Sequence, residues 1–204
     1  MKKALLIWGG WDGHKPLEVA DRIGAELEKR NYEVTKTSHF GCLLNEEELY
    51  SYDVIVPIWS CGIKSDIYLN ELADAIKSGI GLATFHGGIN WFDQDEYYRI
   101  IGGFYLHDTK CESYEVVIAN KDHIITKGQS DFEIYNEKYF LQVDPTNDIL
   151  ASANFSGIEM PIAWTRSYGK GQVFYTTFAH QPEDLFGNNS LEMLLNGIEW
   201  CTRK

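Results

Sequence analysis

The feature that most constrains the fold is a short apolar run that ends in a histidine and two glycines. Residues Leu82–Phe85 are almost wholly apolar, which is typical of a central parallel strand covered on both faces. The run breaks into His86-Gly87-Gly88. Ligands of open α/β sheets bind outside the carboxyl ends of the strands, and glycines there allow a sharp turn. The sequence therefore predicts an α/β sheet with a ligand site at His86.

The residues around His86 also match a strained strand-to-helix turn of the kind that presents a catalytic nucleophile. In that turn, small residues stand two positions before and two positions after the nucleophile. Thr84 and Gly88 hold these positions around His86. An imidazole thus stands where a Ser or Cys would attack a substrate. We therefore expect a site that keeps the shape of a nucleophile turn but carries out a different reaction.

Hydrophobic periodicity predicts that strands and helices alternate in the first half of the chain. Strands are expected over 4–8, 32–39, 54–59 and 82–85, helices over 16–30, 46–50, 65–78 and 93–101, and a loop over 105–108. This alternation is typical of parallel strands joined by right-handed crossovers. We expect a doubly wound sheet.

The second half changes to short alternating runs separated by turn residues, which is typical of antiparallel strands. These runs lie at 114–118, 132–135, 139–143, 149–153 and 161–168, and a tight turn at Gly169-Lys170-Gly171 joins the last of them to a strand over 172–177. A closing helix is expected around 191–198. We interpret residues 1–204 as one domain, because this length with 44% hydrophobic residues suffices for one core.

The net charge and the cysteines limit the binding partners and the cellular compartment that we expect for this protein. The net charge is −12 and no run of Lys or Arg occurs, so we expect no nucleic acid and no anionic membrane as partner. The apolar run after Met1 is too short for a signal peptide or a membrane span. Four scattered cysteines without metal-type spacing indicate free thiols in a reducing, cytoplasmic compartment.

Four histidines follow expected strands or helices, in loops that would meet at one rim of the sheet: His14, His86, His107 and His180. His86 and His180 come at or just after strand ends, where the site residues of α/β sheets lie. We predict general acid and base chemistry for this pair.

A divalent cation is an alternative that the sequence leaves open. The four histidines, joined by Asp12, Asp108 or Glu137, offer the nitrogen and oxygen ligands that suit an ion such as zinc. No H-x-x-x-H spacing supports a metal.

A thiol hydrolase is a further alternative, because Cys61 follows one expected strand and His86 ends the next. Such a mechanism needs an exposed thiol with a lowered pKa, and an inert thiol is the simpler interpretation. The backbone amide of Gly62 is then a candidate anion donor.

Tryptophans in strand-end loops suggest a sugar pocket, since flat aromatic faces bind sugar rings. Trp11, Trp59 and Trp91 occupy such loops. The glycines at 9, 10 and 13 depart from G-x-G-x-x-G, and the expected strand 32–39 ends without an acidic residue for a ribose. We therefore expect a sugar and neither a nucleotide nor a flavin.

Three motifs span nearly the whole chain: Gly9-Gly10-Trp11-x-Gly13-His14-x-Pro16, Gly81-Leu82-x-x-x-His86-Gly87-Gly88 and Gly169-Lys170-Gly171-Gln172-Val173-Phe174-Tyr175-Thr176-Thr177-x-x-His180. With them the chain resembles the trehalose-utilisation, ThuA-like family, whose fold is similar to class I glutamine amidotransferases. Asn136-Glu137-x-Tyr139 resembles the family's Asp-Glu-x-Tyr segment, with Asn136 in place of the usual acid.

The resemblance implies a flavodoxin-like, three-layer α/β/α sandwich with a mainly parallel central sheet and antiparallel additions in the C-terminal half. It implies that His86 replaces the amidotransferase nucleophile, so we expect no glutamine hydrolysis. It also implies a role in the breakdown of disaccharides through keto-sugar intermediates.

The resulting hypothesis is an enzyme acting on trehalose-like disaccharides or their keto derivatives, with His86, His180 and Glu137 as catalytic residues. Residues expected to contact the sugar are Trp11, Asp12, His14, Trp59, Gly62, Gly87, Gly88, Trp91 and His107. The alternative is a non-catalytic sugar-binding or regulatory protein that kept the crevice. A homo-oligomer is expected in either case.

Overall fold

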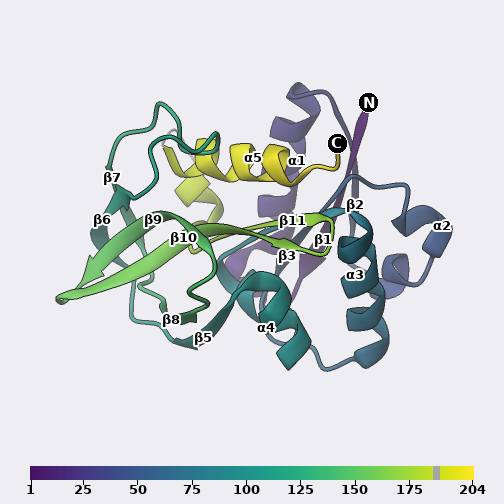
Figure 1. Ribbon diagram of the computed structural model, residues 1–204, viewed down its shortest axis with the longest axis horizontal. Helices are drawn as coiled ribbons and strands as arrows, with labels where there is room; N and C mark the ends of the chain where they lie inside the picture. The colour runs from purple at the N-terminus through teal and green to yellow at the C-terminus, as the bar shows by residue number, and fades with distance from the viewer. Residues whose placement is uncertain (186–188) are drawn as a thin grey trace.

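A nine-stranded sheet crosses the molecule within residues 1–185 and 189–204, which are the residues that the computed structural model describes. Its order is β2-β1-β3-β4-β11-β10-β9-β6-β7 (Figure 1). The strands in that order are β2 (Tyr32–Thr37), β1 (Lys2–Gly9), β3 (Val54–Trp59), β4 (Gly81–Phe85), β11 (Gly171–Thr176), β10 (Ile158–Tyr168), β9 (Asp148–Phe155), β6 (Glu112–Ile118) and β7 (Phe132–Asn136).

The five strands from β2 to β11 pair in parallel, and helices cover both of their faces. Helices α1 (Pro16–Lys29) and α5 (Asn189–Cys201) pack on one face, and α3 (Asp66–Ser78) and α4 (Asp95–Ile101) on the other (Figure 1). Helix α1 turns Val19, Ile23 and Leu27 to the sheet, each at most 1% exposed, because residues four apart share a helix face. The expected three-layer, flavodoxin-like arrangement is confirmed.

The C-terminal half extends the sheet with antiparallel strands, as predicted. Strand β11 runs parallel to β4 on one side and antiparallel to β10 on the other. The last strand of the chain therefore returns to the middle of the sheet. As a result, the segment after β11, with His180, lies beside the segment after β4, with His86.

One expectation was wrong, because the loop expected over 105–108 is largely strand. Strand β5 (Gly103–His107) pairs with β8 (Phe140–Val143) in a separate two-stranded sheet. Its alternation is visible in burial, since Tyr105 is half-buried while Phe104 and Leu106 are exposed. The ladder with β8 orders a run too short to be recognised alone, and it fixes where the loop between β7 and β8 lies.

Short elements complete the described part of the chain: α2 (Glu46–Leu49) and four 3₁₀ turns, η1 (Asp12–His14), η2 (Phe40–Leu43), η3 (His86–Asn90) and η4 (Pro182–Leu185). All four cysteines are free. In the described part of the chain, none of the helices combines the length and the apolar character that crossing a membrane requires.

Candidate metal centre

The backbone at His86 makes the tight turn that the flanking small residues predicted. His86 has φ of 46°, in the left-handed region that residues with a Cβ seldom adopt. A Cβ on Gly88 would lie 1.9 Å from Thr84 Oγ1, and one on Gly87 would lie 2.5 Å from Ser60 Cβ. Backbone strain of this kind is found at functional sites, and here it presents an imidazole at the carboxyl end of β4.

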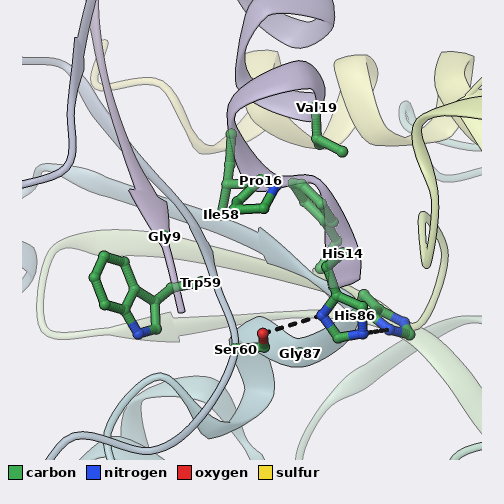
Figure 2. Close-up of a pocket in the computed structure, with 10 residues that line it drawn as sticks. Gly9, His14, Pro16, Val19, Ile58, Trp59, Ser60, His86 and Gly87 are labelled. Atoms are coloured by element: carbon green, nitrogen blue, oxygen red, sulfur yellow. Dashed lines mark hydrogen bonds between the residues drawn. The ribbon is translucent and has the colours of Figure 1, made fainter. Parts of the chain in front are cut away.

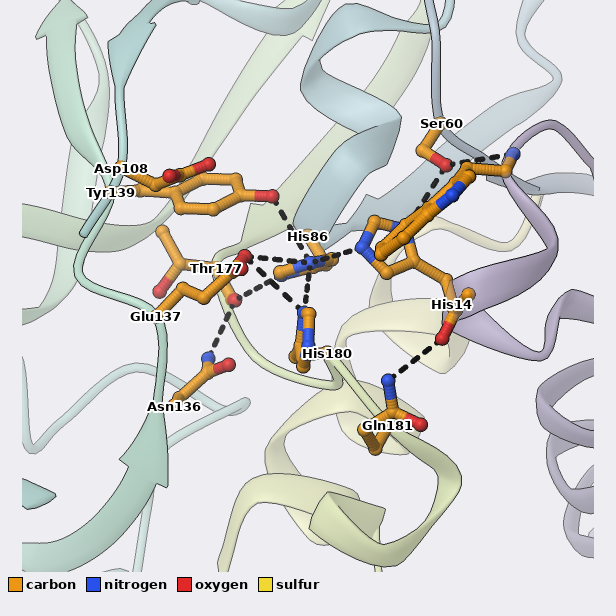
Figure 3. Close-up of polar contacts among 12 residues, drawn as sticks. His14, Ser60, His86, Asp108, Asn136, Glu137, Tyr139, Thr177, His180 and Gln181 are labelled. Atoms are coloured by element: carbon orange, nitrogen blue, oxygen red, sulfur yellow. Dashed lines mark hydrogen bonds and ion pairs between the residues drawn. The ribbon is translucent and has the colours of Figure 1, made fainter. Parts of the chain in front are cut away.

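Four side chains from distant parts of the chain converge at this end of the sheet. His14 comes from η1, His86 from the end of β4, Glu137 from the loop between β7 and β8, and His180 from the segment after β11 (Figure 3). One ligand atom from each of them lies within 4.8 Å of the others. Ala179, with φ of 66°, makes a second left-handed turn directly before His180.

Hydrogen bonds determine which nitrogen of His86 faces this cluster. His86 Nδ1 lies 3.2 Å from the Thr177 carbonyl oxygen, which can only accept, so Nδ1 carries the proton. The same carbonyl accepts a bond of 2.9 Å from Asn136 Nδ2. The lone pair on His86 Nε2 therefore points to His180 Nδ1 at 3.1 Å and His14 Nε2 at 3.3 Å (Figure 3).

Electrostatics keep two of the imidazoles neutral. Burial, and then the neighbouring histidines, hold the pKa of His86 well below its usual range. Burial, with a smaller contribution from His180, lowers the pKa of His14 to about 4. Since His86 is neutral, its 3.5 Å separation from Glu137 Oε2 is not an ion pair.

His180 differs because it pairs with a carboxylate. Its Nδ1 lies 3.2 Å from Glu137 Oε2, and the hydrogen bond to Glu137 raises the pKa of His180 despite partial burial. The carboxylate of Glu137 therefore favours the protonated form of His180.

The donor set fits a divalent cation of the zinc type. Three imidazole nitrogens and one carboxylate oxygen are ligands that zinc prefers. The nitrogens of His180 and His14 lie 3.1 and 3.3 Å from His86 Nε2. Ligands of a tetrahedral zinc ion lie roughly 3.4 Å apart, given metal–nitrogen distances of about 2.1 Å.

Outer contacts also orient these ligands. Histidines that bind metals commonly donate their second ring N–H to an oxygen, and His86 does so to Thr177. His14 Nδ1 lies 3.0 Å from Ser60 Oγ, and the backbone N–H of Trp11 donates to the same hydroxyl oxygen at 3.3 Å. Both imidazoles are thus held with Nε2 toward the centre.

The rim of the cluster carries several of the residues predicted to contact a sugar. Trp11 is 55% exposed and meets His14 edge to face, with ring centroids 4.7 Å apart. Asp12, in the same 3₁₀ turn as His14, is exposed as well, whereas the exposed Gly62 lies beside Asp93. Trp59 is half-buried against Phe40 and lines a cavity of about 20 Å³ together with His14, His86 and Gly87 (Figure 2).

Two predicted site residues need correction. Trp91 is fully buried against Phe92 and Tyr97, so it has no face free to stack on a ligand. The turn after β4 folds it back into the core. His107 is exposed and stacks on Phe140, with ring centroids 4.6 Å apart. It lies outside the cluster, and Glu137 is the fourth member in its place.

The sequence interpretation missed two residues that contact the histidines. Ser60 directly follows β3, at a strand-end position that a search restricted to titratable residues passes over. Tyr139 is 4% exposed, and its hydroxyl lies 3.0 Å from His86 Nε2. The Asn136-Glu137-x-Tyr139 segment was the available signal for it.

Comparison with solved structures shows the same architecture elsewhere. A ThuA-like protein from Bacteroides uniformis superposes with a TM-score of 0.81 at 18% identity, over 98% of this chain and 91% of that one. A cytoplasmic protein from Salmonella typhimurium LT2 gives 0.72 at 16% identity, over 98% and 100%. A β-galactosidase from Bacillus circulans gives 0.67 at 12% identity, over 99% of this chain and 31% of the enzyme. At these identities the likeness shows the fold alone.

Sequence comparison identifies the family. No protein with a curated description matches the chain. The family model for ThuA, described as trehalose utilisation, matches residues 3–201, which is nearly the whole chain. This chain therefore belongs to the ThuA trehalose-utilisation family.

Proposed function

We propose that this chain is a carbohydrate-modifying enzyme that holds a divalent cation on His14, His86, His180 and Glu137. The observation that carries this proposal is the convergence of four ligand atoms within 4.8 Å of one another. They lie at the carboxyl ends of the strands, where α/β sheets bind their ligands. A role in sugar metabolism follows from the family.

The substrate we propose is a trehalose-like disaccharide or its keto derivative. The exposed ring of Trp11 offers a stacking platform beside His14, and Asp12 offers carboxylate oxygens to sugar hydroxyls. Glu137 is the one carboxylate of the described cluster. Ordinary glycosidases use two carboxylates flanking the bond, so this site favours keto-sugar chemistry over direct hydrolysis.

The residues have separate tasks in this proposal. A bound cation would polarise a carbonyl or activate a water. The Thr177 carbonyl and Ser60 hold His86 and His14 with their free nitrogens inward. Glu137 holds His180 through the contact between Oε2 and Nδ1, and its carboxylate would supply the oxygen ligand of the cation.

A second candidate is a sugar-binding or regulatory protein without turnover. The contact between His180 and Glu137, which raises the pKa of His180, supports the enzyme over the binding protein, since a binding protein has no need for such a pair. In a binding protein, His180→Gln leaves sugar affinity nearly intact and there is no turnover to lose.

The decisive experiment measures bound metal by elemental mass spectrometry in protein purified without chelator. We expect about one ion per chain in the wild type and in His107→Gln, whose histidine lies outside the cluster. We expect loss of the ion in His14→Gln and His180→Gln. Absence of metal from the wild type after dialysis against zinc would refute the cation. Turnover of trehalose and keto-sugars by the loaded protein then separates enzyme from binder.

A cytoplasmic location, a homo-oligomeric state and a single-domain organisation stay predictions. The free cysteines support the first of these.

A further inference from the structure

The hydroxyl of Tyr139 has a hydrogen bond that a bound cation would remove. It lies 3.0 Å from His86 Nε2, and no other hydrogen-bond partner of this hydroxyl occurs among the described residues. Because Nδ1 of His86 carries the proton, Nε2 is the acceptor and Tyr139 is the donor. The single lone pair of Nε2 thus serves either Tyr139 or a cation.

The phenol cannot turn to water when this partner is lost. Tyr139 is 4% exposed, and its ring is held between His86, at 4.8 Å between centroids, and Tyr105, at 5.2 Å. A buried donor without an acceptor costs free energy, so its proton needs another oxygen at the same place. The oxygen of a ligand on the cation is such an acceptor.

Resting on the proposed function, we infer that Tyr139 is a substrate-contacting donor, whose hydroxyl binds the carbonyl or hydroxyl oxygen of a sugar held at the His14, His86, Glu137 and His180 cluster. Cation binding thereby switches Tyr139 from a partner of His86 to a partner of the substrate. A donor placed at that oxygen favours a substrate in which negative charge develops there, as it does on a carbonyl.

Tyr105 supplies a matched control. Its ring meets that of Tyr139 edge to face, but its hydroxyl donates to Asp108 Oδ2 at 2.7 Å, away from His86. Tyr139→Phe and Tyr105→Phe each remove one hydroxyl from the same aromatic pair and keep the ring packing. Thermal unfolding checks that both variants fold.

The test uses the full-length protein freed of metal by chelator. Co²⁺ is titrated first and followed by its visible absorption, and acetohydroxamate, a small carbonyl compound that binds metals, is titrated second. We expect Tyr139→Phe to bind Co²⁺ at least as tightly as the wild type, since the competing hydrogen bond is gone. We expect it to bind acetohydroxamate about tenfold more weakly. Tyr105→Phe should match the wild type in both titrations.

Each other outcome has a distinct meaning. Acetohydroxamate affinity within twofold of the wild type in Tyr139→Phe would overturn the role of Tyr139 and leave the cation site standing. Weakened Co²⁺ binding in Tyr139→Phe would also overturn it, because Tyr139 would then support the cation itself. Failure of the wild type to bind Co²⁺ would refute the proposed function, and this inference with it.

Discussion

The turn that presents His86 depends on a glycine whose replacement we predict to be costly for a purely steric reason. A Cβ on Gly88 would lie 1.9 Å from Thr84 Oγ1 and 3.2 Å from Thr84 Cβ. Thr84 is fully buried, and its hydroxyl donates to the Pro57 carbonyl oxygen at 3.0 Å. Gly88→Ala therefore forces the Thr84 hydroxyl to rotate away and abandon this bond.

Two costs add up in Gly88→Ala. Overpacking a buried position costs about 1–3 kcal/mol. The carbonyl of Pro57, left without its donor, costs a further ~1–3 kcal/mol. We expect a loss of about 3 kcal/mol in the free energy of unfolding, or roughly 6–12 °C in the melting temperature of a chain of this size.

A double-mutant cycle tests the cause. Thr84→Ala alone should cost ~1–2 kcal/mol for the lost hydrogen bond and methyl group. In that background the oxygen is absent, so Gly88→Ala should cost less than ~1 kcal/mol, which gives a coupling of about 2 kcal/mol. Gly41→Ala, where no atom lies within 4 Å of the new Cβ, is the control and should change stability by at most about 0.5 kcal/mol.

Unfolding in urea, followed by circular dichroism, measures the free energy of unfolding of the wild type, the three variants of the cycle and the Gly41→Ala control. Two results would refute the steric reasoning. One is a Gly88→Ala variant as stable as Gly41→Ala, and the other is additivity of Gly88→Ala and Thr84→Ala within about 0.5 kcal/mol.

Three further predictions concern the cluster and its rim. Zinc at about a thousand times its dissociation constant should stabilise the protein by ~4 kcal/mol, or roughly 8–16 °C, in the wild type and in His107→Gln but not in His180→Gln; equal shifts in all three would contradict the ligand set. Because the pKa of His14 is lowered to about 4, the folded protein binds fewer protons there than the unfolded chain as pH falls below 6.5. The wild type thus loses stability on acidification. Urea titrations should show that the free energy of unfolding of His14→Gln rises relative to that of the wild type between pH 6.5 and 4, and that the difference between the two is constant above pH 7. A difference that stays constant over the whole pH range would refute the lowered pKa. Trp11→Ala should keep the free energy of unfolding within about 0.5 kcal/mol of the wild type and weaken sugar binding, measured by calorimetry, about tenfold. Trp91→Ala, at a fully buried site, should lower the free energy of unfolding by ~3–5 kcal/mol, and the reverse pattern would contradict the burial of these two side chains.

Local sequence was enough to predict most of the fold. Strands β3 and β4 are continuous apolar runs, because helices cover both faces of the sheet there. The end of β4 then placed His86 correctly, and the turn between β10 and β11 pointed to His180. These predictions needed only periodicity and the rule that ligands bind at strand carboxyl ends.

The missing parts of the site depend on contacts between distant segments. Tyr139 contacts His86 from the segment between β7 and β8, and β8 is held by its pairing with β5, which no local pattern around 105–108 indicated. His107, on the same short strand as Tyr105, is carried to the exposed side. For Trp91, the residue type could not say whether the turn after β4 faces solvent or the core, since that depends on how Phe92 and Tyr97 pack around it.

The position of β11 has a consequence for how the chain is made. Until residues 171–176 have left the ribosome, β4 has only β3 beside it. Its other edge is unpaired, and its residues are all ones that the folded protein buries. Such an edge can pair with another chain, so the nascent protein carries an aggregation hazard through most of its synthesis. The docking of β11 removes this edge, and the next few residues deliver His180 to His86. If the cluster binds the proposed cation, it can do so only when the sheet is complete, and metal content would then report the fraction of chains that have finished folding.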